Sequence, residues 1–413
     1  MERTARSSEE GSGISPAATD RGGPWPRFHD VYWAYKAARI GKPSSTHQIR
    51  FQIDEALELV SLHRDIHSGR YCPSRAICFV VTHPKPREIW ASHFRDRVVH
   101  HLIVSRLEPL WERRFSTRSF ACRKRMGSHK AVSELCSLVR KVSRSGRREA
   151  WVLQLDVASF FVSIDRLRVL DLLLRDRMEP VLRSLVDVTF RHDPRTNVWN
   201  QAPEALRALI DPSKSWFNRG AMEGLPIGNL TSQFAANVYL DGVDHFIERT
   251  LRPQGYLRYM DDMTLVDSDP ERLRAMAEPV DAWLKERRGQ RLNAAKTTFK
   301  AASRESIDYL GYRLIPDRRN PTKVVYVSVD PKKKWDFVRE LRVLEKRGLP
   351  PGLKLHPMWP QYSHTKAREA WGAVRSREGH LSHASAYEFM QRSLEKTELA
   401  LGSRWVDMAD LGS

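Results

Sequence analysis

The segment LRYMDDMTLV, Leu257 to Val266, places two adjacent aspartates between two short apolar runs. In a regular strand neighbouring side chains point to opposite faces, so Asp261 and Asp262 can share one site only at the tip of a strand-turn-strand unit. We therefore predict a β-hairpin whose tip carries both carboxylates and binds a metal ion. Acidic residues are also common in ordinary turns, so the pair alone does not establish such a site.

A second apolar segment also ends on an aspartate. VLQLDVASFFVSID, Val152 to Asp165, has the pattern of a strand that ends at Asp156 and is followed by two aromatic residues. Asp156 and Asp261 are 261 − 156 = 105 residues apart, which is far enough for them to lie on separate strands of one sheet. Carboxylate oxygens on neighbouring strands are hard ligands, so the pattern predicts a site for two Mg²⁺ ions roughly 3.5–4 Å apart, with Mn²⁺ as the alternative ion.

The composition indicates a folded protein that binds nucleic acid. The 413 residues carry a formal net charge of +19 and are 41% hydrophobic, which is typical of a packed basic protein rather than of a disordered basic tail. An acidic membrane surface is the rival partner, but we find no clear basic amphipathic helix or lipidation site. Four cysteines without a Cys-x-x-Cys pair, and no run of eighteen apolar residues, predict a cytoplasmic location and no membrane contact.

Three segments, in this order, resemble motifs A, B and C of a reverse transcriptase. They are the Asp156 strand with its two aromatic residues, GLPIGNLTSQ at 224–233, and the hairpin at 259–262. Flanking matches extend the likeness from about Phe28 to Leu401. The resemblance implies an RNA-directed DNA polymerase with an α+β right-hand fold: an antiparallel palm sheet, helical fingers and a helical thumb. The implied partners are an RNA template, a DNA or RNA primer and dNTPs, with Mg²⁺ as cofactor.

Domain boundaries follow from composition and from the same resemblance. Residues 1–27 are rich in Ser, Gly, Pro, Arg and Glu, which predicts a disordered tail. We expect fingers over 28–150, a palm with motifs A to E and part of the fingers over 151–320, and a thumb over 321–413. The segment 193–218, with three prolines, is an irregular insertion to which we assign no function.

The resemblance also implies roles for individual residues. Asp156, Asp261 and Asp262 would be catalytic, and the same three residues with Val157 would form the metal site. The residues expected to contact the nucleotide are Arg87, Phe160, Ile227, Gln233 and Lys296. The residues expected to contact nucleic acid are Arg123, Lys124, Gly228, Asn229, Tyr259 and Gly311.

Four of these roles are specific. Arg87 would lie over the incoming nucleotide and pair with its phosphates. Phe160 would lie under the sugar and exclude a 2′-hydroxyl, the alternative being an ordinary core aromatic. Lys296 would protonate the leaving pyrophosphate, the alternative being a surface lysine. Arg123, together with its neighbour Lys124, would contact the template or the triphosphate.

The pattern Ile227-Gly228-x-x-x-Ser232-Gln233 distinguishes subfamilies. Group II intron and retroviral enzymes usually have Gln-Gly-x-x-x-Ser-Pro here, whereas the present pattern resembles reverse transcriptases of diversity-generating retroelements. That resemblance implies error-prone copying of a template-repeat RNA at adenines, with a small basic accessory protein. The alternatives are a related bacterial reverse transcriptase in anti-phage defence or a group II intron and, from another class, a non-catalytic nucleic-acid-binding protein on a polymerase-like fold.

Overall fold

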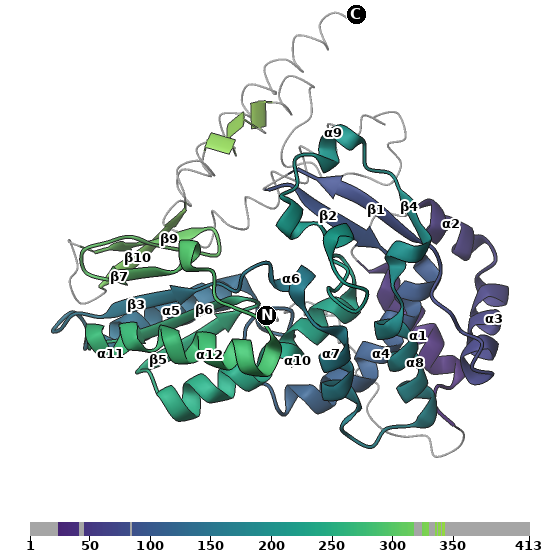
Figure 1. Cartoon of the computed structure of the whole chain (residues 1–413), viewed down its shortest axis with the longest axis horizontal. Helices are drawn as coiled ribbons and strands as arrows, with labels where there is room; N and C mark the ends of the chain where they lie inside the picture. The colour runs from purple at the N-terminus through teal and green to yellow at the C-terminus, as the bar shows by residue number, and fades with distance from the viewer. Residues whose placement is uncertain are drawn as a thin grey trace, which may run out of the picture.

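The computed structural model of the chain describes residues 24–40, 45–82, 85–317, 324–329, 335–336, 338–339 and 341–342. The predicted tail (1–27) and the predicted thumb (321–413) therefore lie almost entirely outside the described residues. What is described is a mixed helix and strand structure with mostly antiparallel sheets (Figure 1). The prediction of an α+β class with an antiparallel sheet is confirmed at this level.

The helices fall in two groups along the chain, before and after the first central strand. The first group is α1 (Phe28–Arg39), α2 (Thr46–Ile53), α3 (Glu55–His67), α4 (Phe94–Glu112) and α5 (Ser128–Val142). The second group is α6 (Phe160–Ser163), α7 (Arg166–Leu174), α8 (Pro180–Arg191), α9 (Glu204–Arg207), α10 (Leu230–Phe246), α11 (Pro270–Ala275) and α12 (Ala277–Arg288).

A four-stranded antiparallel sheet lies at the centre of the structure. Its strands, in spatial order, are β5 (Gly255–Tyr259), β6 (Asp262–Asp267), β3 (Trp151–Leu155) and β7 (Thr298–Ala301). Side chains alternate between its faces: Leu153 and Leu155 pack in the core formed with α10 to α12, while Val152 packs in the other core, with α5 and the C-terminal strands. In Figure 1 helices α11 and α12 lie below this sheet, and β9 and β10 lie above it.

Two smaller sheets flank the central one. The first has the order β2 (Arg87–Ala91), β1 (Ala76–Val81), β4 (Val198–Asn200), with β4 parallel to β1. The second has the order β10 (Val325–Val329), β9 (Tyr312–Pro316), β8 (Ile307–Tyr309) and is antiparallel. Leu310 and Gly311 join β8 to β9 with φ of 50° and 81°, the positive values that a two-residue type I′ hairpin turn requires.

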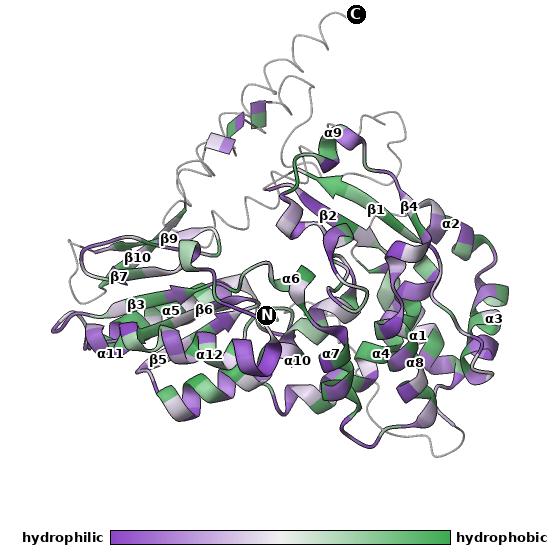
Figure 2. Ribbon diagram, viewed as in Figure 1, coloured by the Kyte–Doolittle hydropathy of each residue, from purple (hydrophilic) through white to green (hydrophobic). Residues whose placement is uncertain are grey.

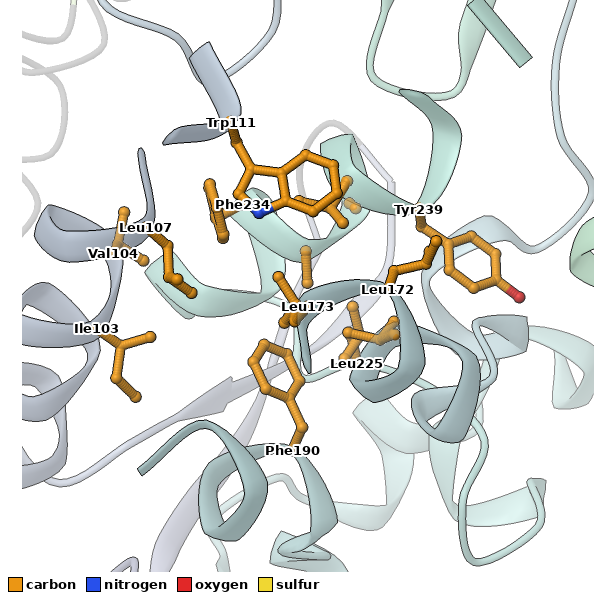
Figure 3. Close-up of a cluster of buried hydrophobic side chains, with 14 of the residues drawn as sticks. Ile103, Val104, Leu107, Trp111, Leu172, Leu173, Phe190, Leu225, Phe234 and Tyr239 are labelled. Carbon is orange, nitrogen blue, oxygen red and sulfur yellow. The ribbon is translucent and has the colours of Figure 1, made fainter. Parts of the chain in front are cut away.

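The larger core joins the early helices to the later ones. Leu107 and Trp111 of α4 pack among side chains from α7, α8 and α10, including Leu173, Phe190 and Phe234 (Figure 3). Helix α12 mixes hydrophilic and hydrophobic residues along its ribbon (Figure 2): Lys285, Glu286 and Arg287 are exposed, whereas Val280 and Leu284 are buried. This continuous core ties the central sheet to the N-terminal helices.

The segment 193–218 is part of the fold rather than an appendage. It supplies β4 and the fully buried Trp216, which is 1% exposed and packs edge-on against Trp90 at 5.0 Å between ring centroids. The buried Glu88 carboxylate accepts a 2.9 Å bond from the Trp216 backbone N–H. The backbone of Gly224 passes directly against this indole: a Cβ at Gly224 would lie 2.2 Å from Trp216 Nε1, at φ +85°.

Substitution of Gly224 tests this packing. We expect Gly224→Ala to lower the free energy of unfolding by about 2–4 kcal/mol, because the methyl group combines positive-φ strain with a clash against a buried ring. Gly69→Ala is the matched control, since Gly69 has φ +69° and open space around the added methyl; it should cost about 1 kcal/mol. Urea unfolding measures both. Equal losses would show that the contact with Trp216 is unimportant.

Candidate active site

The two adjacent aspartates lie at the tip of a tight hairpin, as predicted. Tyr259 at the end of β5 pairs with Asp262 at the start of β6, so Met260 and Asp261 form a two-residue turn. Met260 has φ +56°, a conformation that costs a non-glycine residue roughly 1–2 kcal/mol. The hairpin therefore holds its turn against a local energetic cost.

The third aspartate lies across from this hairpin on the neighbouring strand. β3 pairs with β6 as far as Leu155 opposite Met263, which brings the following residue, Asp156, across from Asp262. Its backbone carbonyl accepts a 2.7 Å hydrogen bond from the Asn293 N–H, and Val157 forms an isolated bridge with Leu292. Two adjacent strands and one loop thus position the cluster.

The charges in this cluster influence one another. Burial, with the nearby negative charge of Asp156, raises the pKa of Asp261 to about 6. Burial and the charges of Asp261 and Asp156 raise the pKa of Asp262 to about 7. The Lys296 ammonium lies 2.6 and 2.7 Å from the two carboxylate oxygens of Asp156. The site holds more negative charge than its single lysine neutralises, an imbalance that a bound cation would relieve.

The donor set suits a hard divalent cation. Three carboxylates from two paired strands offer the oxygen ligands that Mg²⁺ and Mn²⁺ prefer. Within the described residues no group of three or more His, Cys, Asp or Glu side chains is already arranged as a complete metal site. The metal site and the identity of its ion therefore stay predictions.

Several residues expected to contact the nucleotide or the nucleic acid lie on β2 and around the start of α10. Arg87 is exposed at the start of β2, and its positive charge opposes the rise in the Asp261 pKa. The Ile227 carbonyl accepts a 3.0 Å bond from the Trp90 N–H, which joins the segment before α10 to β2. Gly228 is exposed with φ +116°, a backbone conformation that favours glycine. Asn229 precedes α10 and is buried, and Gln233 in the first turn of that helix is half-buried.

Two adjacent aromatic residues follow Asp156. Phe160 is 3% exposed and belongs to the main core, whereas Phe161 is half-buried. The two rings pack edge-on, with 5.3 Å between centroids. Phe161 therefore presents more surface than Phe160.

Arg123, which we expected to contact nucleic acid, has its side chain bonded within the protein. Its side chain is only 5% exposed. The Arg123 guanidinium donates to the Glu112 carboxylate and to the carbonyls of Ser116 and Ser119, at 2.6–3.1 Å. All three guanidinium nitrogens therefore donate within the protein. Lys124 is different: its side chain is 82% exposed and pairs with Glu108 at 2.7 Å.

The remaining predicted contacts lie at the hairpin β8–β9 and beside it. Gly311 is exposed at the tip of that hairpin, and Tyr259 is half-buried in the core that includes β8 and β9. The Gln154 amide donates a 3.0 Å bond to the Asp308 carbonyl. This bond ties the β8–β9 hairpin to the central sheet near the carboxylates.

Sequence reasoning missed one residue of the site. Arg258, directly before Tyr259, is completely buried and forms an ion pair at 2.7 Å with Asp244 of α10, which is also completely buried. The available signal was an arginine inside an otherwise apolar strand, which must find a buried partner.

These features define the catalytic domain of a nucleic-acid polymerase. The model of the family "Reverse transcriptase (RNA-dependent DNA polymerase)" matches residues 83–314, more than half of the chain. The chain therefore belongs to the reverse transcriptase family and is an RNA-directed DNA polymerase, a nucleotidyltransferase. Its substrates are accordingly nucleotides and an RNA template.

A curated relative is similar over most of both chains. Protein YkfC of Escherichia coli (strain K12) is 25% identical over 346 residues, which cover 73% of this chain and 85% of the relative.

Reverse transcriptase domains generally use divalent metals such as Mg²⁺. No helix among the described residues is both long enough and apolar enough to cross a membrane.

Proposed function

We propose that the enzyme makes cDNA by two-metal nucleotidyl transfer at Asp156, Asp261 and Asp262. The observation that carries this proposal is the register of β3 against β6, which brings Asp156 and the hairpin that carries Asp261 and Asp262 to the same end of two neighbouring strands. The raised pKa values of Asp261 and Asp262 support it: burial raises both, the neighbouring carboxylates add to the rise, and a cation between the carboxylates would offset both effects. Val157 belongs to the proposed metal site through its backbone position next to Asp156.

The protein's own groups have distinct tasks in this proposal. Bound divalent cations would activate the primer 3′-hydroxyl and neutralise charge on the leaving pyrophosphate. Lys296, now paired with Asp156, carries a proton within reach of the site and would deliver it to that leaving group. Arg87 would pair with the triphosphate. The β8–β9 hairpin would position the primer end beside Tyr259 and Gly311.

The domain arrangement is part of the proposal. Residues 28–150 would form the fingers and 151–320 the palm of a right hand, with the thumb over 321–413. The exposed Lys124, with Gly228 and Asn229, would contact the template strand along its phosphates.

Removal of one carboxylate tests the chemistry. Asp156→Asn or Asp261→Asn should lower primer extension on RNA by at least about a hundred-fold, because loss of a charged metal ligand removes several kcal/mol of transition-state stabilisation. RNA binding should stay within a few-fold of the parent. Asp171→Asn, the same change on the exposed surface of α7, should leave both unchanged. Efficient synthesis by either site variant would exclude this assignment.

A second experiment addresses sugar selection. We propose Phe160 as the ring that excludes a 2′-hydroxyl, so Phe160→Ala should raise ribonucleotide incorporation relative to deoxynucleotides. Because Phe160 is 3% exposed, the truncation should also cost about 3–5 kcal/mol of stability, and the assay is run well below the unfolding temperature. Phe161→Ala is the control. Relaxed selection in Phe161→Ala alone would assign the gate to the neighbouring ring.

For the biological role we propose the diversity-generating retroelement type, with error-prone copying and a small basic accessory protein. Ile227 is apolar where related enzymes usually have glutamine, and a site rejects mismatches best when its own polar groups would be left unpaired. The proposal predicts frequent misincorporation opposite template adenine.

Restoring the amide tests that role. Ile227→Gln should reduce errors at adenine about two- to twelve-fold, which corresponds to one recovered hydrogen bond of about 0.5–1.5 kcal/mol. Deep sequencing of cDNA from a defined RNA template measures the error at each base. Ile49→Gln, on the exposed side of α2, is the matched control. Uniformly low error in the parent and in Ile227→Gln would instead favour the anti-phage defence role.

A further inference from the structure

A buried ion pair lies directly beneath the catalytic hairpin. Arg258 of β5 and Asp244 of α10 are both completely buried. The two side chains form a bidentate pair, with Arg258 Nε and Nη2 each 2.7 Å from a different oxygen of Asp244. Burying two charges is costly, and such a pair seldom adds net stability over apolar residues of similar volume. The pair at this position must therefore have a role other than stabilising the fold.

The third guanidinium nitrogen reaches the turn itself. Arg258 Nη1 donates a 2.8 Å hydrogen bond to the carbonyl oxygen of Met260. Met260 is the residue with φ +56°, and Asp261 follows it directly. A charged donor bound to this carbonyl fixes the peptide between Met260 and Asp261, and this peptide determines where the Asp261 carboxylate points.

The rest of the network fixes the arginine in turn. The Asp244 carboxylate also accepts a 2.6 Å bond from the Tyr256 hydroxyl, and Arg258 Nη1 donates to Asn237 at 3.2 Å. The Arg258 backbone pairs with the segment before α5: its N–H donates to the Arg118 carbonyl and its carbonyl accepts from the Phe120 N–H. The guanidinium thus has one available orientation.

We infer that Arg258, held by Asp244, is a positioning residue that keeps the Met260–Asp261 turn in the geometry that catalysis needs. The inference rests on the proposed function, since it assumes that Asp261 is a catalytic ligand. On this inference the buried charges position the active site, and they do not serve to stabilise the fold.

The experiment separates geometry from stability. The variant Arg258→Met/Asp244→Leu/Tyr256→Phe replaces the ion pair and its hydroxyl donor with apolar groups of similar size. We expect its urea midpoint to stay near that of the parent, while kcat falls about ten- to a hundred-fold with dNTP KM within a few-fold. Mn²⁺ binding to the protein alone, followed by electron paramagnetic resonance, should weaken several-fold.

Two further variants make the result decisive. Arg258→Lys keeps a charge for Asp244, but a single ammonium cannot also reproduce the fork that reaches Met260, so kcat should fall here as well. Arg272→Met removes the donor from Asp267, a completely buried carboxylate at the opposite end of β6; it should lose stability and keep kcat.

The outcomes distinguish this inference from the proposed function. Full kcat and unchanged Mn²⁺ binding in a folded apolar variant and in Arg258→Lys, with Asp261→Asn inactive, would overturn the positioning role alone. Full synthesis by Asp261→Asn would overturn the proposed function, and the positioning role with it. A fall in kcat in Arg272→Met equal to that in the Arg258 variants would also overturn it, because any loss of stability would then suffice.

Discussion

The antiparallel pairing of β3 with β6 is the constraint on which the site depends. Five residue pairs, from Trp151 opposite Asp267 to Leu155 opposite Met263, set the register. Because side chains alternate with a period of two, a slip of one residue would turn Leu153 and Leu155 out of the core and Asp156 away from the hairpin. The apolar residues that bury one face of the sheet therefore also set the pairing that brings Asp156 across from Asp262.

Local strain and buried charge meet at the hairpin. The turn holds Met260 at positive φ, and the strand beneath it carries an arginine that is completely buried. The strained turn costs free energy, and the buried ion pair seldom adds stability over apolar residues of similar volume. Both features lie at one turn, next to the proposed catalytic carboxylates. This location indicates that the precise position of these carboxylates matters more here than the stability of the fold.

The segment 193–218 shows how a region without any motif supports a site. The Trp216 backbone N–H donates to the Glu88 carboxylate of β2, and the Trp216 indole lies against Gly224. Trp90, also in β2, donates its backbone N–H to the Ile227 carbonyl. The loop before α10 is thus fixed from two sides. A substitution within 193–218 would therefore change the position of the loop before α10, and with it the proposed nucleotide pocket, although no residue of the motifs is replaced.

The sequence by itself determined the hairpin, the strand that ends at Asp156 and the enzyme class, because periodicity and turn chemistry act over a few residues and the motifs are contiguous. The tertiary structure decided which side chains are available. Arg123 lies in a basic run typical of a surface, yet Glu112 and two carbonyls enclose it. Phe160 and Phe161 are chemically alike, and only packing buries the first more deeply. Arg258 and Lys296 pair with Asp244 and Asp156, which are 14 and 140 residues away along the chain, so the local sequence could not identify these partners. Burial and ion pairing depend on groups that only the folded chain brings into contact.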